Sequence, residues 1–125
     1  MKNYCLTDRV KRNYLMEIGE EEFDRILNIL SVSTDKTRMK ILFLLMENEE
    51  MCICELSSLL GITRSAVSQH LSILKEMSLL SSRKDGKFVY YSIKNKNIRK
   101  LLLSFKEFIR KEVKDGGIKS NKNNR

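Results

Sequence analysis

Three cysteines are the side chains of this sequence best suited to specific chemistry. Cys52 and Cys54 are separated by one residue, and Cys5 lies near the N-terminus. Side chains two positions apart on a helix point about 200° away from each other, so the pair can share an ion only where a helix begins. Two sulfurs are also fewer than the three or four ligands of a tight site. A metal site here therefore needs Cys5, brought over the pair by an N-terminal arm of the same subunit or of a partner.

The same cysteines allow more than one kind of chemistry. Thiolates are soft ligands, so a three-sulfur site without histidine suits arsenic(III), antimony(III), lead(II) or cadmium(II), and zinc(II) if a further ligand joins. A reversible disulfide between Cys5 and one of the pair would instead make a redox sensor. Free cysteines are also often small buried hydrophobic residues. The odd number of cysteines disfavours a framework of structural disulfides.

The elements that must position these cysteines are mostly helices. Apolar residues recur at helical spacing in five segments. The predicted helices begin near Gly19, Asp35, Cys52, Thr63 and Asn95. The third of them is short and is stopped by Gly61, and the fourth is longer and is capped by Thr63. This succession is the layout of a helix-turn-helix.

The pattern changes to that of strands over residues 80–93. Two runs that favour strands are joined at Asp85 and Gly86, which is a strong hairpin signal. The predicted fold is therefore mainly α with a small β-hairpin, a winged helix-turn-helix in the order α-α-α-α-β-β-α. We expect residues 1–18 to form an arm, residues 19–113 a DNA-binding and dimerisation domain, and residues 114–125 a disordered basic tail.

The charge of the chain indicates a polyanionic partner. The net charge is +8, and part of the excess coincides with the helix-turn-helix and the hairpin. Small polar and basic side chains on the first turns of the fourth helix can approach base edges. Basic side chains of the hairpin can lie on phosphates or in the minor groove of double-stranded DNA. The predicted DNA-binding residues are Arg64, Ser65, Ser68, Gln69, His70, Arg83, Lys84 and Lys87.

Some of these residues also have ordinary interpretations. A polar face of a helix is often only solvated, and lysines in a hairpin also protect exposed strands from aggregation. His70 is the only histidine, and we favour a packing or phosphate-contacting role for it over that of a metal ligand. The first and last helices carry apolar stripes outside the helix-turn-helix. Packing them against a symmetry mate would form a homodimer with two recognition helices about 34 Å apart.

Other classes of function are disfavoured by the sequence. One histidine, no phosphate-binding glycine loop and no paired carboxylates argue against an enzyme. No apolar run approaches the roughly 20 residues of a membrane span, and the first residues lack the apolar stretch of a signal peptide. We therefore expect a cytoplasmic protein with no membrane partner and no organic cofactor.

Several linked motifs strongly resemble the ArsR/SmtB family of metal-responsive repressors. They are residues 50–56 (EMCICEL), 61–71 (GITRSAVSQHL) and 86–92 (GKFVYYS), together with residues 35–38 (DKTR) at the start of the second helix. The likeness covers roughly residues 20–113. It implies a homodimeric winged-helix repressor that binds operator DNA and leaves it when a metal binds.

The resemblance also implies a ligand set. The family's site in the helix-turn-helix uses a C-x-C pair at the positions of Cys52 and Cys54. Arsenic sensors of this kind often have a third cysteine where this chain has Ser57. Cadmium and lead sensors instead recruit cysteines from an N-terminal arm, as Cys5 would here. The family's other zinc site needs Asp and His pairs that the last helix lacks.

The sequence therefore predicts a metal-responsive transcriptional repressor that is released from operator DNA when cadmium, lead or arsenic(III) binds its thiolates. A thiol-based redox sensor of the same fold is one alternative. A metal-buffering or protein-interaction module without specific DNA binding is the other.

Overall fold

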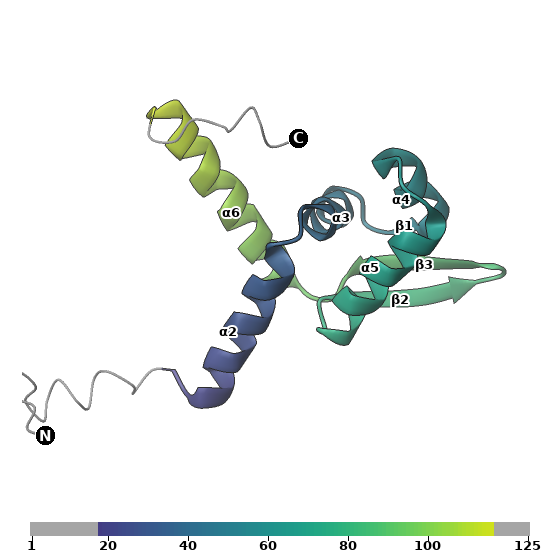
Figure 1. The fold of residues 1–125 in the computed structure, drawn as a ribbon, viewed down its shortest axis with the longest axis horizontal. Coiled ribbons are helices and arrows are strands. Elements are labelled where there is room, and N and C mark those ends of the chain that lie inside the picture. Colours follow the sequence, from purple (N-terminus) through teal and green to yellow (C-terminus); the bar gives the residue numbers. More distant parts are fainter. Residues whose placement is uncertain (1–17, 117–125) are drawn as a thin grey trace, which may run out of the picture. The chain divides into compact units, whose positions relative to one another are not determined.

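The computed structural model describes residues 18–116 and confirms a mainly helical winged helix-turn-helix with a small antiparallel sheet (Figure 1). The elements follow in the order α2 (Glu20–Ser33), α3 (Lys36–Glu47), β1 (Met51–Cys52), α4 (Ile53–Leu60), α5 (Arg64–Glu76), β2 (Leu80–Asp85), β3 (Phe88–Ile93) and α6 (Lys96–Lys114). Helix α2 belongs to one compact unit, and the elements from α3 onward belong to another. Cys5 and most of the predicted arm and tail lie outside the described residues.

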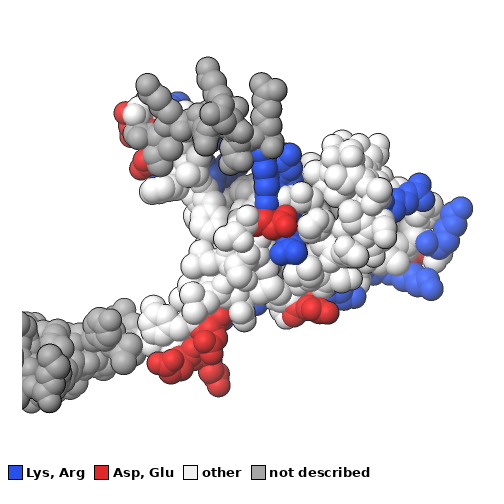
Figure 2. Space-filling view, in the orientation of Figure 1, with Lys and Arg blue, Asp and Glu red and all other residues white. Residues whose placement is uncertain are grey.

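Helix α2 is amphipathic and acidic at its start. Glu20, Glu21 and Glu22 occupy the first turn, where negative charge complements the helix dipole. Figure 2 shows acidic side chains gathered on this helix. Its apolar stripe is exposed, and it consists of Phe23, Ile26, Leu27 and Leu30.

The core of the larger unit lies between its helices and the sheet. Helix α3 packs against α5, α6 and β3. The side chains that are fully buried are Ile41, Leu45, Leu56, Val67, Leu71 and Leu74. Three of them repeat at i, i+4 and i+7 along α5, so its opposite face is left to solvent, as helical periodicity predicts.

The predicted helix boundaries around the turn are confirmed. Helix α4 ends at Gly61, whose φ of +68° lies in the left-handed region. The Thr63 hydroxyl accepts a hydrogen bond of 3.1 Å from the backbone N–H of Ala66, which caps α5. The Asn95 side chain accepts bonds from two backbone N–H groups at the start of α6. These caps fix where the recognition helix and the last helix begin.

The sheet has one strand that the sequence did not predict. Its order is β1-β3-β2, and β1 pairs Met51 with Tyr91 and Cys52 with Tyr90. Cys52 therefore lies in a strand, and α4 begins one residue later than predicted. A two-residue strand is too short to show the alternation by which strands are recognised.

The hairpin turn also lies one residue later than expected. Asp85 pairs with Phe88, so the two-residue loop consists of Gly86 and Lys87. Gly86 has a φ of +61°, the conformation that the first position of such a loop requires. The shift places Lys87 at the tip of the wing.

Helix α6 joins the core only through its first half. Ile98 and Leu102 are buried, whereas Phe108, Ile109 and Val113 are more than half exposed. Within residues 18–116, no helix has the length and apolar character required to cross a membrane.

Candidate DNA-binding face and thiol pair

The first turns of α5 present most of the predicted base-reading residues to solvent. Arg64, Ser65, Ser68 and Gln69 are exposed, because the intervening Val67 points into the core. Small hydroxyl groups permit close approach to DNA, and arginine and glutamine can bond base edges in pairs. The arrangement suits a helix that reads a major groove with its N-terminal residues.

His70 has a different environment from its neighbours on α5. It is half-buried, and its Nδ1 accepts a hydrogen bond of 3.2 Å from Nε of Arg38 in α3. The imidazole therefore connects the recognition helix to the helix behind it. This contact gives His70 a packing role within the protein, and its contact with DNA stays a prediction.

The hairpin carries a basic tip. Arg83, Lys84 and Lys87 are exposed, and Figure 2 shows basic side chains gathered at the end of the hairpin. The ammonium of Lys87 lies 5.4 Å from the centre of the Phe88 ring. A basic tip of this kind can lie along phosphates.

Arg83 is engaged within the protein. Its Nε lies 2.9 Å from Oε2 of Glu50, and its Nη2 donates to Oε1 of the same carboxylate. Its guanidinium carbon lies 4.9 Å from the centre of the Tyr90 ring. The hydrogen bonds with Arg83 lower the pKa of the Glu50 carboxyl below its ordinary value of 4.5. Sequence reasoning assigned no role to Glu50 or Tyr90, because their association with Arg83 depends on strand pairing.

The thiol pair lies where β1 passes into α4. Cys52 is buried and extended at the N-cap, and Cys54 is half-buried in the first turn. The backbone N–H of Cys52 donates a bond of 3.1 Å to Oε1 of Glu55. The Cys52 side chain faces the backbone N–H of Glu55 in return, which forms a capping box. The pair thus occupies a helix start, the position at which two sulfurs in this spacing can serve one ion.

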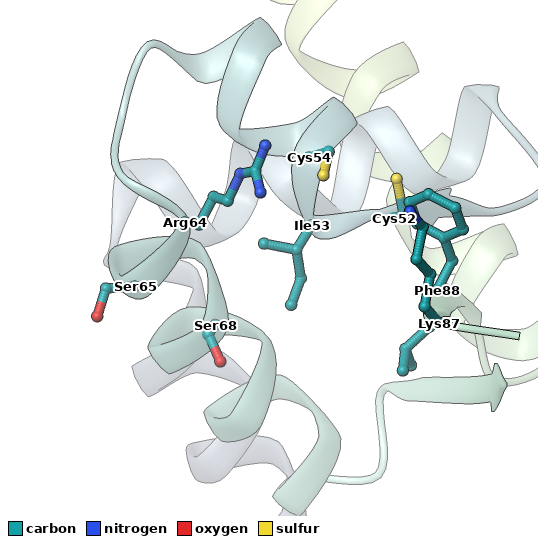
Figure 3. Close-up of a pocket in the computed structure, with 9 residues that line it drawn as sticks. Cys52, Ile53, Cys54, Arg64, Ser65, Ser68, Lys87 and Phe88 are labelled. Atoms are coloured by element: carbon teal, nitrogen blue, oxygen red, sulfur yellow. The ribbon is translucent and has the colours of Figure 1, made fainter.

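The thiols and some of the residues predicted to bind DNA line the same groove. The groove has a volume of about 810 Å³, and Figure 3 shows it between the start of α4, the start of α5 and the hairpin. The residues that line it are Cys52, Ile53, Cys54, Arg64, Ser65, Ser68, Lys87, Phe88 and Val89. In Figure 3 the Arg64 guanidinium points toward the side where Cys54 lies. The apolar members were not predicted as site residues, and only their nearness to the thiols in space reveals them.

The described residues form no complete metal site. Within residues 18–116, no three Cys, His, Asp or Glu side chains lie close enough to hold an ion. The donor set that is present, two free thiols, is of the type that soft metals prefer. It fits such an ion if a further ligand is added.

The chain is similar in sequence and in fold to bacterial transcriptional regulators. Residues 35–82 match the family described as "Bacterial regulatory protein, arsR family". A cadmium resistance transcriptional regulatory protein of Listeria innocua is 34% identical over 85 residues, which are 66% of this chain and 71% of that protein. The arsenical resistance operon repressor of Escherichia coli is 37% identical over 67 residues, 54% of this chain and 57% of that one. Among solved structures, reduced HlyU of Vibrio cholerae is similar to this chain with a TM-score of 0.65 and 28% sequence identity. The similarity covers 71% of this chain and 93% of HlyU.

Proposed function

The chain belongs to the arsR family of bacterial regulatory proteins, which makes it a DNA-binding transcriptional regulator and not an enzyme, and from that premise we propose that it is a repressor released by a soft metal ion. The ion would bind the thiolates of Cys52 and Cys54. Relatives named for cadmium and arsenical resistance support an inducer of this class.

The observation that carries the proposal is the groove shared by the thiols and the recognition helix. An ion at the thiol pair would lie in the groove that Arg64, Ser68 and Lys87 also line, and all three are proposed to contact DNA. A bound ion would therefore alter both the charge and the side-chain positions of the face that meets the duplex. Metal and DNA would favour different states of the protein, and each would weaken binding of the other by the same factor.

The nature of the third ligand bears on which ion is sensed. The Ser57 hydroxyl, at the position where arsenic sensors have a third cysteine, donates a hydrogen bond to the backbone carbonyl of Ile62. It thereby serves the turn of the helix-turn-helix. With Ser57 engaged in this way, Cys5 would be the third ligand. The likeness to a cadmium resistance regulator then favours cadmium(II) as the ion. Zinc(II) would need a further ligand.

We also propose that the repressor acts as a homodimer on double-stranded operator DNA. The exposed apolar side chains of α2, and those of the second half of α6, would be covered by the partner subunit. The two helices have complementary charge, since α2 begins with three glutamates and α6 ends with two lysines in its last turn. A two-fold dimer would present two recognition helices to successive turns of the duplex.

The test is operator binding with and without cadmium(II), arsenite, lead(II) or zinc(II), alongside absorption spectra that count metal–thiolate bonds. Cys52→Ser is expected to keep operator binding, because serine is a preferred N-cap, and to abolish release by metal. Ser58→Ala, an exposed change on the same helix, is the matched control and should respond like the wild type. Metal-induced release from Cys52→Ser that equals the wild-type release would refute the proposal.

A redox sensor of the same fold is the second candidate. It is favoured by two free thiols that line an open groove, and by the likeness to a regulator whose structure was solved in a reduced form. It requires a disulfide from Cys5 to Cys52 or Cys54. Mass spectrometry after mild oxidation would detect this crosslink, and its absence would exclude the redox sensor.

A further inference from the structure

The two outer strands of the sheet are joined by side chains that cross over the central strand. Glu50 directly precedes β1, Arg83 lies in β2, and Tyr90 lies between them in β3. The Glu50 carboxylate receives hydrogen bonds from Arg83, whose guanidinium lies over the Tyr90 ring. The backbone register places Cys52 opposite Tyr90 and Tyr90 opposite Arg83. Residues directly opposite in an antiparallel sheet project to the same face.

We propose that Glu50, Arg83 and Tyr90, termed here the latch, are positioning residues that transmit the state of the thiol pair to the wing. The inference rests on the proposed metal response and assigns the route by which it reaches one of the two DNA-binding elements.

The backbone pairing between β1 and the hairpin is short. It consists of the two residue pairs that Met51 and Cys52 make with β3, and none with β2. The latch adds a direct connection from the start of β1 to β2. Because β2 leads into the loop at Gly86 and Lys87, a displacement of Cys52 by a bound ion would reach the wing tip through both outer strands.

The geometry of Arg83 suits this role better than that of a simple phosphate contact. Its Nε and Nη2 both donate to Glu50, and its Nη1 lies 3.7 Å from a carboxylate oxygen of Asp85. A planar guanidinium held by a carboxylate and an aromatic face has a defined orientation. Lys84 is instead a basic residue on a flexible stem, exposed at the same hairpin.

Exposure of the latch makes its role separable from folding. The Arg83 side chain is 53% exposed and the Glu50 side chain 34% exposed. Ion pairs in such positions contribute little to overall stability. Removing the Glu50 charge should therefore leave a folded protein whose wing is less firmly tied to the thiol strand.

The experiment measures operator affinity of the full chain with and without cadmium(II), using Glu50→Gln and, as matched control, Glu49→Gln. Glu49 is the neighbouring exposed glutamate. For Glu50→Gln we expect metal-free operator affinity within about threefold of wild type. We expect the ratio of metal-free to cadmium-bound affinity to fall by at least about fivefold. Glu49→Gln should match the wild type in both quantities.

A second pair of variants tests the aromatic part of the latch. Tyr90→Phe keeps a ring beneath the guanidinium and should retain the wild-type ratio, whereas Tyr90→Leu should lower it. Cadmium–thiolate absorption should be unchanged in all variants, since the thiols are intact. Loss of that absorption together with the ratio would overturn the inference, because the residues would then be serving metal binding itself.

The remaining outcomes separate the inference from the function on which it rests. If the wild type is not released by cadmium or any other tested ion, both fail. If wild type and Glu50→Gln are released equally, the latch fails and the metal response stands. If Glu50→Gln lowers the metal-free operator affinity but leaves the ratio of metal-free to cadmium-bound affinity unchanged, the latch also fails. Such a result would show that Glu50 positions the wing for DNA binding and does not transmit the metal response.

Discussion

Nε of Arg38 lies 3.2 Å from Nδ1 of His70 in a hydrogen bond that ties α3 to the recognition helix. The imidazole accepts this bond, and it is half-buried on the flank of a helix whose neighbouring residues are exposed. The bond therefore adds a polar contact between α3 and α5 to the apolar packing of Val67, Leu71 and Leu74, which orients α5 in the core.

Replacing His70 by leucine should destabilise the protein. The change removes the acceptor of the hydrogen bond from Arg38, at a cost of about 0.5–1.5 kcal/mol in the free energy of unfolding. Urea denaturation would measure it. Equal midpoints for wild type and His70→Leu would show that the contact contributes nothing to stability.

Gln69→Ala, at the position next to His70, should leave the stability of the protein unchanged and weaken its discrimination between DNA sequences. The Gln69 side chain is exposed, so stability should stay within about 0.5 kcal/mol of wild type. Discrimination between operator and random duplex should fall by about 1–3 kcal/mol, because a paired contact to a base is lost. Competition binding at fixed salt would measure this, with the exposed Ser72→Ala as control. Unchanged discrimination would exclude Gln69 from base reading.

Lys87→Ala should weaken binding to all duplexes alike. At the tip of the wing this lysine is placed for a phosphate contact, which carries no sequence information. The slope of log affinity against log salt should decrease in magnitude by about 1. Lys96→Ala, at the start of α6, provides a control of equal charge change. The same slope in wild type and Lys87→Ala would place the wing tip away from the phosphates.

The ion pair of Glu50 and Arg83 predicts a pH dependence with a definite sign. Arg83 holds the pKa of Glu50 below 4.5 in the folded protein, so the folded state favours the ionised carboxylate. The resulting stabilisation is present above pH 4.5 and is lost as the pH falls through the lowered pKa. The difference in unfolding free energy between wild type and Glu50→Gln should therefore be small at neutral pH and shrink further on acidification. A difference that is independent of pH would contradict the pairing.

Gly61→Ala should destabilise the helix-turn-helix through the backbone alone. The φ of +68° disfavours a side chain by about 1–2 kcal/mol, while the space that a methyl group would enter is open. Gly61→Asn should lose less, because asparagine tolerates the left-handed region. Thermal unfolding of the two variants would test this order, and an alanine variant as stable as wild type would refute it.

Much of the fold could be predicted because its signals are local. The spacing of Val67, Leu71 and Leu74, with Thr63 before them and Gly61 before that, defines the recognition helix within a short segment. The exposed residues of its first turns follow directly from this periodicity. The hairpin was predicted for the same reason, with an error of one residue in its turn.

Strand β1, the contact between Glu50 and Arg83, and the groove could not be predicted, because each brings together residues that are far apart in the sequence. Strand β1 exists because Met51 and Cys52 meet the central strand, and neither residue shows a strand pattern by itself. Arg83 was predicted as a DNA contact from its charge and position, but its association with Glu50 arises from the sheet register. The groove brings together three separate segments, so its apolar residues carried no signal before the fold was known.

The capping box at the start of α4 has a consequence for how such a protein can evolve. Cys52 occupies a position at which serine, threonine, asparagine and aspartate are the usual caps. A descendant protein in which this cysteine is replaced by serine would keep α4, the turn and the recognition helix, and would lose a proposed sulfur ligand. The proposed metal response could therefore be lost, and later regained, through changes at this one position that leave the start of α4 capped.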